Sequence, residues 1–564
     1  MDNTFTNTKI TTQTETLTFV HYLLFALFIL FAFFYGISSY VIADLNEGLY
    51  VEIAREMLTT HNYIIPHLNY VPYLEKPPLL YWLIALSDKI FGITTLSARL
   101  IPALSATIAC LTLFYVCNKI NKAKAGWYAG IVLSTSIGFN LLAHTIQFDM
   151  LLIAAITIGI LFFYLWYCFD KKRYLLCAYA AVAIAVMAKG LIGLIICGST
   201  AFIFMFLMAT PSAKIKQFFD PMAILLFLLI ALPWHIAATI QLPSFAWDYF
   251  VNEQWYRFLN DRIPHDYHTG PFYYYFPRIF VYLFPWCLLL PTVIGPIRGK
   301  IAQQDPLKVL LWIWFIFAFV FFSVSGSKGD YYMLVAAPAL ALLIGLKIAR
   351  FENGHFLYSL WLICCVILAG VGVTAYYFHF TPSTINPFLL LFLTYLLIYF
   401  IVGLFLIRPS SKPIIIFLYT ASLIFPLILF YITVKQSIEI NYTEIVLAQY
   451  IHAHDNVRPV YLYKNYEDIS SIVYFLHQRL TIIDSDSEDL YFGSHSPEAN
   501  HWFINSNNFK NIARNHNVYV VTTNKNTLNF LEHLWPIPFC IVDKTDKTSL
   551  LSNNINECLK IHPQ

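Results

Sequence analysis

Long apolar runs recur along the chain, and their lengths are those of membrane-spanning helices. The first, "VHYLLFALFILFAFFYGISSYVI", covers residues 20–42, and about 20 apolar residues are enough for a helix to cross a bilayer. Further runs lie at residues 98–118, 125–146, 148–168, 174–188, 190–208, 219–240, 272–296, 307–325, 331–349, 356–379, 386–407 and 413–434. The pattern predicts an α-helical integral membrane protein with about 13 transmembrane helices, accompanied by interfacial helices.

Polar segments divide this pattern into three parts. Residues 1–18 are rich in Thr and Asn and predict a short tail, and the first span is expected to remain as an uncleaved anchor. Residues 19–435 then form the membrane domain. After residue 435 the strand-like stretches "VYLYK", "LTIID" and "VYVVTT" alternate with helical stretches, which predicts a small α/β domain over residues 436–564.

Composition agrees with a membrane protein. The chain is 59% hydrophobic and only 12% charged, whereas soluble domains carry about 25% charged residues. The formal net charge of +3 indicates no particular partner, and we expect no nucleic-acid partner. Most of the ten cysteines lie in apolar runs, where cysteine is usually a small core residue. A disulfide between Cys540 and Cys558, which lie in the polar C-terminal part, is left open by the sequence.

Lysine and arginine predict the orientation of the chain in the membrane. They gather in every second loop, at Lys119, Lys122, Lys124, Lys171, Lys172, Arg173, Lys214, Lys216, Arg298, Lys300, Lys347, Arg350, Arg408 and Lys412. Cytoplasmic loops carry an excess of such residues, so these loops and the N-terminus are expected in the cytoplasm. Loops 44–97 and 241–271 and the α/β domain are then expected on the outer face.

The stretch "ADLNEGLYVEIAREM", residues 43–57, places polar groups directly after the first span. Leu49, Ile53 and Met57 share one helical stripe, which predicts an amphipathic helix lying in the membrane interface. Its N-terminal end carries Asp44, Asn46 and Glu47. Helix capping would explain such residues, and a functional acidic group is the alternative.

Other ionisable residues fall on the same predicted face. Glu75 and Lys76 precede a proline pair that starts a helix, and they form either an interfacial salt bridge or a binding pair. Asp149 opens the fourth span, where a carboxylate is costly and is a candidate for function, although a helix cap is the competing interpretation. Lys189 lies between two spans and either snorkels to the interface or contributes to a site.

Two loops add cations and aromatic side chains. Segment 241–271 contains Arg257 and His265 among many tyrosines, which suits contact with polar head groups or a simple aromatic belt. The glycine-punctuated turn "SGSKGDYY" contains Lys328 and Tyr332 and can hold an anion.

The chemistry that this face suits is the transfer of a group linked to a lipid through phosphate. Cations would stabilise the departing phosphate. A carboxylate would orient or deprotonate the nucleophile.

The motifs resemble those of polyprenyl-phosphate-dependent multispan glycosyltransferases. The similarity covers about residues 20–350 and rests on "NEGLYVEIAREML", "PHLNYVPYLEKPPLLYW", "SARLIPALSA", "FDMLL", "AKGLIGL" and "FFSVSGSKGDYYMLVAAPALALL". The aminoarabinose transferases of lipid A look most similar, followed by the protein O-mannosyltransferases. The resemblance implies an inverting transfer of a sugar, such as aminoarabinose, from undecaprenyl phosphate at the periplasmic face of a bacterial inner membrane. It implies lipid A, another envelope glycan or a protein as the acceptor.

The same resemblance implies roles for individual residues. Asp149, Glu47 and Asn46 match acidic positions of the active site, although the family usually has Asp where this chain has Asn46. Lys76, Arg257 and Tyr332 match binders of the lipid phosphate.

Other matches are less direct. Lys328 matches the family's turn lysine, and Asp44, Glu75, Lys189 and His265 are supporting candidates. No cofactor is certain: a divalent metal held by Glu75 is the one candidate, but the chain has Asn252, Glu253 and Gln254 where relatives carry the second ligand.

Two other classes of function stay open at this point. One is a transporter of polyprenyl-linked lipids, which should show polar residues at mid-membrane and internal repeats, whereas the charges here gather at one face. The other is a catalytically inactive relative that binds the lipid, which the substitution at Asn46 allows. The sequence does not decide the sugar, the acceptor, the need for a metal or the oligomeric state.

Overall fold

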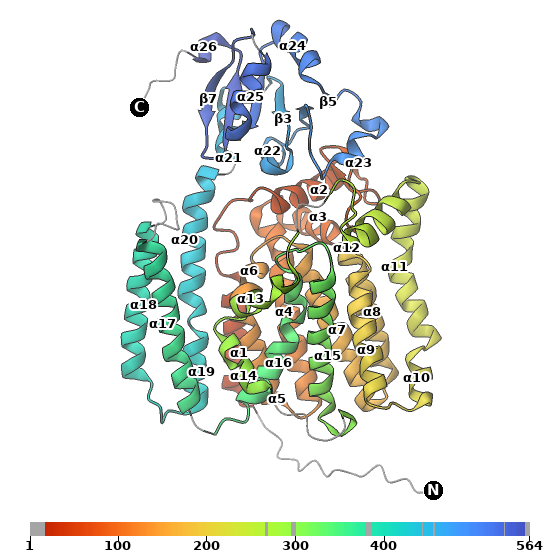
Figure 1. Cartoon of the computed structure of the whole chain (residues 1–564), viewed down its shortest axis with the longest axis vertical. Helices are drawn as coiled ribbons and strands as arrows, with labels where there is room; N and C mark the ends of the chain where they lie inside the picture. Colours follow the sequence, from red (N-terminus) through yellow and green to blue (C-terminus); the bar gives the residue numbers. More distant parts are fainter. Residues whose placement is uncertain are drawn as a thin grey trace.

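The computed structural model describes residues 17–265, 269–294, 301–352, 354–377, 386–442, 444–454, 457–534 and 536–558. A bundle of long helices carries a smaller part that contains a β-sheet at one of its ends (Figure 1). The predicted N-terminal tail falls almost entirely outside the described residues.

The helices of the bundle follow the predicted apolar runs. They are α1 (Phe19–Phe34), α4 (Thr95–Lys119), α5 (Ala123–Ser134), α6 (Ile137–Ala143), α7 (Phe148–Phe169), α8 (Lys172–Lys189), α9 (Ile192–Leu207), α10 (Ser212–Phe218), α11 (Pro221–Gln241), α13 (Tyr275–Tyr282), α14 (Leu290–Val293), α15 (Pro306–Val324), α16 (Ala337–Ile348), α17 (His355–Tyr377), α18 (Asn386–Leu406), α19 (Pro413–Ala421) and α20 (Ile424–Tyr442). Within the described residues, seven helices are long and apolar enough to span a membrane, or nine if each of two bent pairs counts as one span. The multispan helical architecture is confirmed, and the number 13 stays a prediction.

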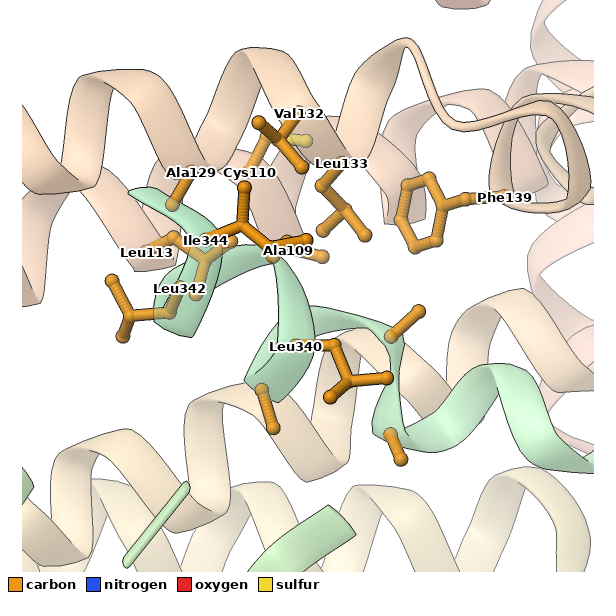
Figure 2. Close-up of a cluster of buried hydrophobic side chains, with 14 of the residues drawn as sticks. Ala109, Cys110, Leu113, Ala129, Val132, Leu133, Phe139, Leu340, Leu342 and Ile344 are labelled. Carbon is orange, nitrogen blue, oxygen red and sulfur yellow. The ribbon is translucent and has the colours of Figure 1, made fainter. Parts of the chain in front are cut away.

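Small side chains let the central helices pack closely. Figure 2 shows side chains of α4, α5 and α16 in one buried cluster, among them Cys110, Val132 and Leu340. At Gly345 a Cβ atom would lie 2.5 Å from the carbonyl oxygen of Ala125, so no larger residue fits without displacing backbone. Close approach of backbones at small residues is how helices associate in membranes. Helix α7 is also enclosed by its neighbours, since 83% of its apolar 18-residue stretch is buried.

Three ion pairs join loops that the sequence predicts on one side of the membrane. Lys122 lies 2.9 Å from Asp305, Lys172 lies 2.9 Å from Asp220, and Lys214 lies 3.2 Å from Asp170. These groups flank α4, α15, α8, α11, α7 and α10. The pairs therefore support the prediction that every second loop lies on the same side of the membrane.

The C-terminal part contains a six-stranded mixed sheet in the order β5-β4-β3-β6-β8-β7. Its strands are β3 (Val460–Tyr463), β4 (Thr481–Ile483), β5 (Phe503–Ile504), β6 (Tyr519–Thr523), β7 (Cys540–Lys544) and β8 (Thr548–Ser552), and its helices are α21 (Ile445–His454), α22 (Ser471–Leu476), α23 (Tyr491–Ser494), α24 (Ser506–Asn515), α25 (Asn524–Leu534) and α26 (Ile555–Cys558). The first four strands of that order are parallel, and β8 and β7 add antiparallel pairs. Cys540 is disulfide-bonded, and the side chain of Cys558 lies outside the described part.

The polar segment after α1 forms α2 (Asn46–Thr60), β1 (His67–Leu68), β2 (Val71–Pro72) and α3 (Leu79–Phe91). Helix α2 lies between the bundle and the sheet-containing part (Figure 1), and Leu49 and Ile53 share a hydrophobic core with Leu447 and Ile472. At Gly48 a Cβ atom would lie 2.6 Å from Ser470 Oγ and 2.9 Å from the backbone nitrogen of Ser471. The C-terminal part is thus seated directly on α2.

This seating corrects the predicted interfacial helix. Every residue of α2 from Glu47 to Met57 is buried, including the side that the sequence assigns to water. Glu52 and Arg55 form a buried ion pair at 2.6 Å. The amphipathic pattern gives the wrong environment because a second layer of protein, contributed by residues about 400 positions later, covers the polar side.

Candidate functional site

A cavity of about 250 Å³ is lined by residues from the first turn of α7 and the last turn of α8. Its lining combines Lys76, Asp149, Lys189, Glu253, Arg257 and Tyr332 with the apolar side chains of Leu152, Leu191, Ile192, Ile195, Phe250, Trp255, Phe258, Phe321 and Phe322. A concave site with apolar walls and a few convergent charges fits a ligand that has a polar head and an apolar body.

Asp149 and Lys189 form an ion pair at this cavity. The Lys189 Nζ atom lies 2.7 Å from Oδ1 and 2.6 Å from Oδ2 of Asp149, and it also lies 4.3 Å from the centre of the Tyr332 ring. Asp149 belongs to the first turn of α7 and Lys189 to the last turn of α8, where the helix dipoles favour these charges. Lys189 therefore pairs with a carboxylate instead of snorkelling, and Asp149 does not serve as the helix cap.

Glu253 gathers three cations. Its Oε2 atom lies 3.4 Å from Lys76 Nζ and 3.0 Å from Arg257 Nη1, and its Oε1 atom accepts a hydrogen bond from Arg262 Nε. Glu253 lies in a π-helical segment, Trp247–Tyr256, a geometry that is rare and often found at functional sites. Two of the three cations, Lys76 and Arg257, line the cavity.

Glu75 joins the same network from the other side. Its Oε1 atom accepts a hydrogen bond of 2.6 Å from Arg262 Nη2, and its Oε2 atom lies 3.4 Å from Lys76 Nζ. Burial by itself would raise the pKa of Glu75, but Arg262, Lys76 and Arg257 lower it to about 2. Glu75 is therefore an ionised anchor for cations.

These contacts do not fit a divalent metal at Glu75. The guanidinium of Arg262 bridges Glu75 and Glu253, so both carboxylates already have a cation of the protein as their partner. No group of three or more His, Cys, Asp or Glu side chains in the described ranges is arranged to hold a metal ion.

The acidic group at the start of α2 has a different setting. Glu47 is buried, lies 2.7 Å from Arg99 Nη2 and accepts a hydrogen bond of 3.0 Å from the backbone nitrogen of Ile146. Burial would raise the pKa of Glu47, but Arg99 and these hydrogen bonds hold it below its ordinary value. Asn46 is exposed and accepts a hydrogen bond of 2.8 Å from Tyr50 Oη. Neither Glu47 nor Asn46 lines the cavity.

Asp44 connects the membrane bundle to the C-terminal part. Its Oδ1 atom accepts a hydrogen bond of 3.0 Å from the backbone nitrogen of Ser471, and its carboxyl group is hydrogen-bonded to Glu444. Burial raises the pKa of both carboxyl groups, and their proximity raises that of Glu444 further. A proton shared between the two carboxyl groups accounts for their hydrogen bond. Asp44 therefore has a structural role at the contact between the two parts.

Two other predicted residues lie away from the cavity lining. Lys328 is buried and donates to three backbone carbonyls, those of Phe322, Ser323 and Ser325, at 2.6 to 2.8 Å. All three of its donor hydrogens are engaged at the end of α15, so the predicted contact with phosphate is not supported for Lys328. His265 is exposed and is not part of the lining.

Sequence reasoning missed several residues of the network. Glu253 and Arg262 lie in a segment that the sequence singles out, but nothing in it indicates that Arg262 bridges Glu253 and Glu75. Arg99, a fully buried arginine that also donates to the carbonyls of Ile37, Tyr40 and Val41, could have been noticed as a charge inside an apolar run. Asp489, which is hydrogen-bonded to Glu75, carries no local signal in the sequence.

Comparisons with known proteins bear out the resemblance. Residues 75–236 match the dolichyl-phosphate-mannose-protein mannosyltransferase family. The undecaprenyl phosphate-alpha-4-amino-4-deoxy-L-arabinose arabinosyl transferase of Pectobacterium carotovorum is 30% identical over 310 residues, which are 53% of this chain and 54% of that protein. An uncharacterised protein of Aquifex aeolicus is 29% identical over 356 residues, which are 61% of this chain and 77% of that protein. The chain spans a little over half the length of the arabinosyl transferase it matches.

The fold has a solved counterpart. The crystal structure of ArnT from Cupriavidus metallidurans bound to undecaprenyl phosphate matches with a TM-score of 0.81 and 19% sequence identity, covering 96% of this chain and 99% of that chain. The apo state of the same protein gives a TM-score of 0.79. The chain thus has this multispan membrane fold over nearly its whole length.

Proposed function

We propose that the protein transfers a sugar from undecaprenyl phosphate to an acceptor of the bacterial envelope, with aminoarabinose as the sugar and lipid A as the acceptor. The cavity carries the proposal, because Lys76, Arg257 and Lys189 meet there above apolar walls. Such a site suits a lipid with a phosphate head. The names of the similar arabinosyl transferases support the donor and the sugar.

The reaction is a displacement at the anomeric carbon. An oxygen of the acceptor forms a bond to that carbon while the bond to the phosphate oxygen breaks, and undecaprenyl phosphate departs with the electron pair. Lys76 and Arg257 stabilise the charge that develops on this phosphate, a role in which one donor is commonly worth about 3 kcal/mol. Asp149, which is held by Lys189 and also lines the cavity, orients the acceptor.

The acidic residues favour an acceptor that is itself ionised. Asn46 cannot accept a proton, and the lowered pKa of Glu47 makes it a weak base. A phosphate group of lipid A needs no base, since it is ionised at neutral pH. A hydroxyl acceptor would depend on Asp149 instead.

The proposed topology has 13 spans with a cytoplasmic N-terminus in the inner membrane. Nine candidate spans, three shorter apolar helices (α1, α9 and the segment Tyr332–Ile348) and α8 make this number. The C-terminal part, residues 436–564, then lies in the periplasm beside the cavity. The disulfide at Cys540 supports this side, because disulfides persist in oxidising compartments. We also propose that activity requires no metal, given the bridge that Arg262 makes.

The experiment is mass spectrometry of lipid A from a bacterium that lacks its own aminoarabinose transferase and expresses this protein. We expect a mass increase equal to one aminoarabinose, lost or reduced about a hundredfold in Lys76→Ala and Asp149→Ala. Lys89→Ala is the matched control, because Lys89 is exposed on α3 and does not line the cavity.

The alternatives predict other results. Unmodified lipid A with the wild-type protein would remove this acceptor or sugar. Undecaprenyl-phosphate binding without any transfer, followed by a gain of transfer in Asn46→Asp, would identify an inactive lipid-binding relative. A transporter would leave the sugar on its lipid carrier.

A further inference from the structure

The C-terminal part contributes side chains to the charged network of the cavity. The loop that follows β4 brings Asp489 into a hydrogen bond with Glu75, and it places Glu488 Oε2 4.0 Å from Arg262 Nη1. These residues are about 410 positions apart in the sequence from Glu75.

The loop itself is held firmly. The backbone nitrogen of Asp489 donates to Glu467 Oε1 at 2.7 Å, and Ser487 Oγ donates to the same atom at 2.5 Å. Helix α23 follows directly and packs on β2, where a Cβ atom at Gly493 would lie 2.6 Å from the carbonyl oxygen of Pro72. Asp489 is therefore fixed relative to the C-terminal sheet on one side and to the loop containing Glu75 on the other.

A continuous chain of contacts leads from Asp489 to the cavity. Asp489 bonds to Glu75, Glu75 binds Arg262 at 2.6 Å, and Arg262 bonds to Glu253. Glu253 then lies 3.4 Å from Lys76 and 3.0 Å from Arg257, the two cavity cations. Displacing the first carboxyl would change the partners available to both cations.

We propose that Asp489 is a positioning residue that fixes Glu75 and, through Arg262 and Glu253, sets the geometry of Lys76 and Arg257. The C-terminal part is then a component of the site and not an appendage of the membrane domain. The identity of the ligand in this proposal rests on the proposed function, whereas the geometry of the cations does not.

The charge state of Asp489 follows from the groups around it. Glu75, Glu467 and Arg262 face it, together with the hydroxyl groups of Tyr50, Tyr73 and Tyr81 from α2, the segment before α3, and α3. Burial and the two carboxylates raise the pKa of Asp489 well above its ordinary value, although Arg262 opposes them.

A hydrogen bond between two carboxyl groups requires one proton, and because Glu75 is ionised we assign that proton to Asp489, which donates it to Glu75. Because the pKa is raised, this bond is present at lower pH and is lost as the pH rises through the pKa of the folded state. Ionised Asp489 would repel Glu75 and compete for Arg262, which loosens the two cavity cations.

The test uses the full chain in lipid nanodiscs and has two readouts. The first is the rate at which the Lys76 amine is acetylated, which is measured by mass spectrometry. This rate reports how firmly the partners of Lys76 hold its amine, and the measurement needs no ligand. The second is the affinity for undecaprenyl phosphate across a pH series. In Asp489→Ala we expect faster labelling of Lys76 and an affinity lower by about tenfold, the usual effect of losing a hydrogen bond to a charged group.

Two further variants make the result specific. Asp489→Asn keeps a neutral hydrogen-bond donor. Lys76 should therefore be acetylated as slowly as in the wild type, and the affinity for undecaprenyl phosphate should depend little on pH. Asp486→Ala changes an exposed carboxylate of the same loop and should behave as the wild type. Wild-type labelling in Asp489→Ala, or an unchanged pH profile in Asp489→Asn, would overturn the proposal. Absence of undecaprenyl-phosphate binding by the wild type would instead refute the proposed donor, and the labelling would still decide the role of Asp489.

Discussion

Asp149 and Lys189 show how a costly charge becomes tolerable at the edge of a membrane. Each is nearly buried, with side-chain exposures of 5% and 13%, and each satisfies the other between the start of α7 and the end of α8. An unpaired carboxylate in this position would be strongly destabilising. The pair therefore belongs to the architecture of the site as well as to its proposed chemistry.

In the proposed reaction, Asp149→Asn should lower sugar transfer by at least about a hundredfold, because the amide keeps the shape but loses the charge that holds Lys189 and that we propose orients the acceptor. The measurement is the rate of lipid A modification by the purified protein. Asp170→Asn is the matched control, since Asp170 ends the same helix at its other end and is exposed. Equal loss in both variants would show that the effect is structural and not local to the cavity.

Glu75 should make the stability of the protein sensitive to acid. Its pKa is lowered from 4.5 to about 2, so its contribution is present above pH 4.5 and is lost as the pH falls toward 2. The shift corresponds to about 3 kcal/mol. Melting curves should show Glu75→Gln less stable than the wild type at neutral pH, with the difference shrinking in acid.

The control for this prediction is Glu532→Gln, because Glu532 is exposed on α25. It should follow the wild type at every pH. A constant gap between Glu75→Gln and the wild type down to the lowest pH would contradict the assignment of Glu75 as an ionised anchor.

At the scale of elements, the contact between α2 and α22 decides how the C-terminal part is seated. This contact depends on Gly48, which leaves no room for a side chain under Ser470 and Ser471. The loop carrying Asp489 is set by the same seating. A disturbance at Gly48 should therefore be felt at the cavity.

Gly48→Ala should destabilise the protein by about 1–3 kcal/mol through overpacking and raise the rate of proteolysis between α20 and β3. Melting temperature and limited proteolysis are the measurements. Gly198→Ala is the control, because Gly198 lies in α9 with no atom within 4 Å of an added Cβ. Gly48→Ala with wild-type melting and proteolysis would mean that the two helices do not meet as closely as described.

At the scale of the whole molecule, the helix bundle and the C-terminal part form one structural unit. The buried ion pair of Glu52 and Arg55 on α2 and the shared carboxyl pair of Asp44 and Glu444 are enclosed by both parts together. Neither part alone would cover these groups.

Removing residues 436–564 should therefore leave α2 with exposed apolar and charged surface, and the shortened protein should aggregate. Size-exclusion chromatography in detergent checks this outcome, with the full chain as the reference. A monodisperse, active bundle would show that the C-terminal part is dispensable and would contradict the view of a single unit.

The sequence by itself determined the multispan architecture, since a span must match the thickness of the bilayer whatever its neighbours are. Most predicted runs coincide with helices to within a few residues, although α1 already ends at Phe34 and α20 continues to Tyr442. Lys76, Asp149, Lys189, Arg257 and Tyr332 do meet at one cavity. The motifs that carry the resemblance contain four of these residues, and Arg257 lies in segment 241–271, which the sequence singles out for its cations and aromatic side chains.

Only the tertiary structure decided which charges are partners. Three features depend on segments that are far apart in the chain: the bridge that Arg262 makes between Glu75 and Glu253, the contact of Asp489 with Glu75, and the burial of α2. Hydrophobic periodicity reports that one side of a helix is apolar, but it does not report what covers the polar side. Burial and pairing of charges are consequences of packing, so they become definite when the C-terminal part closes over the bundle.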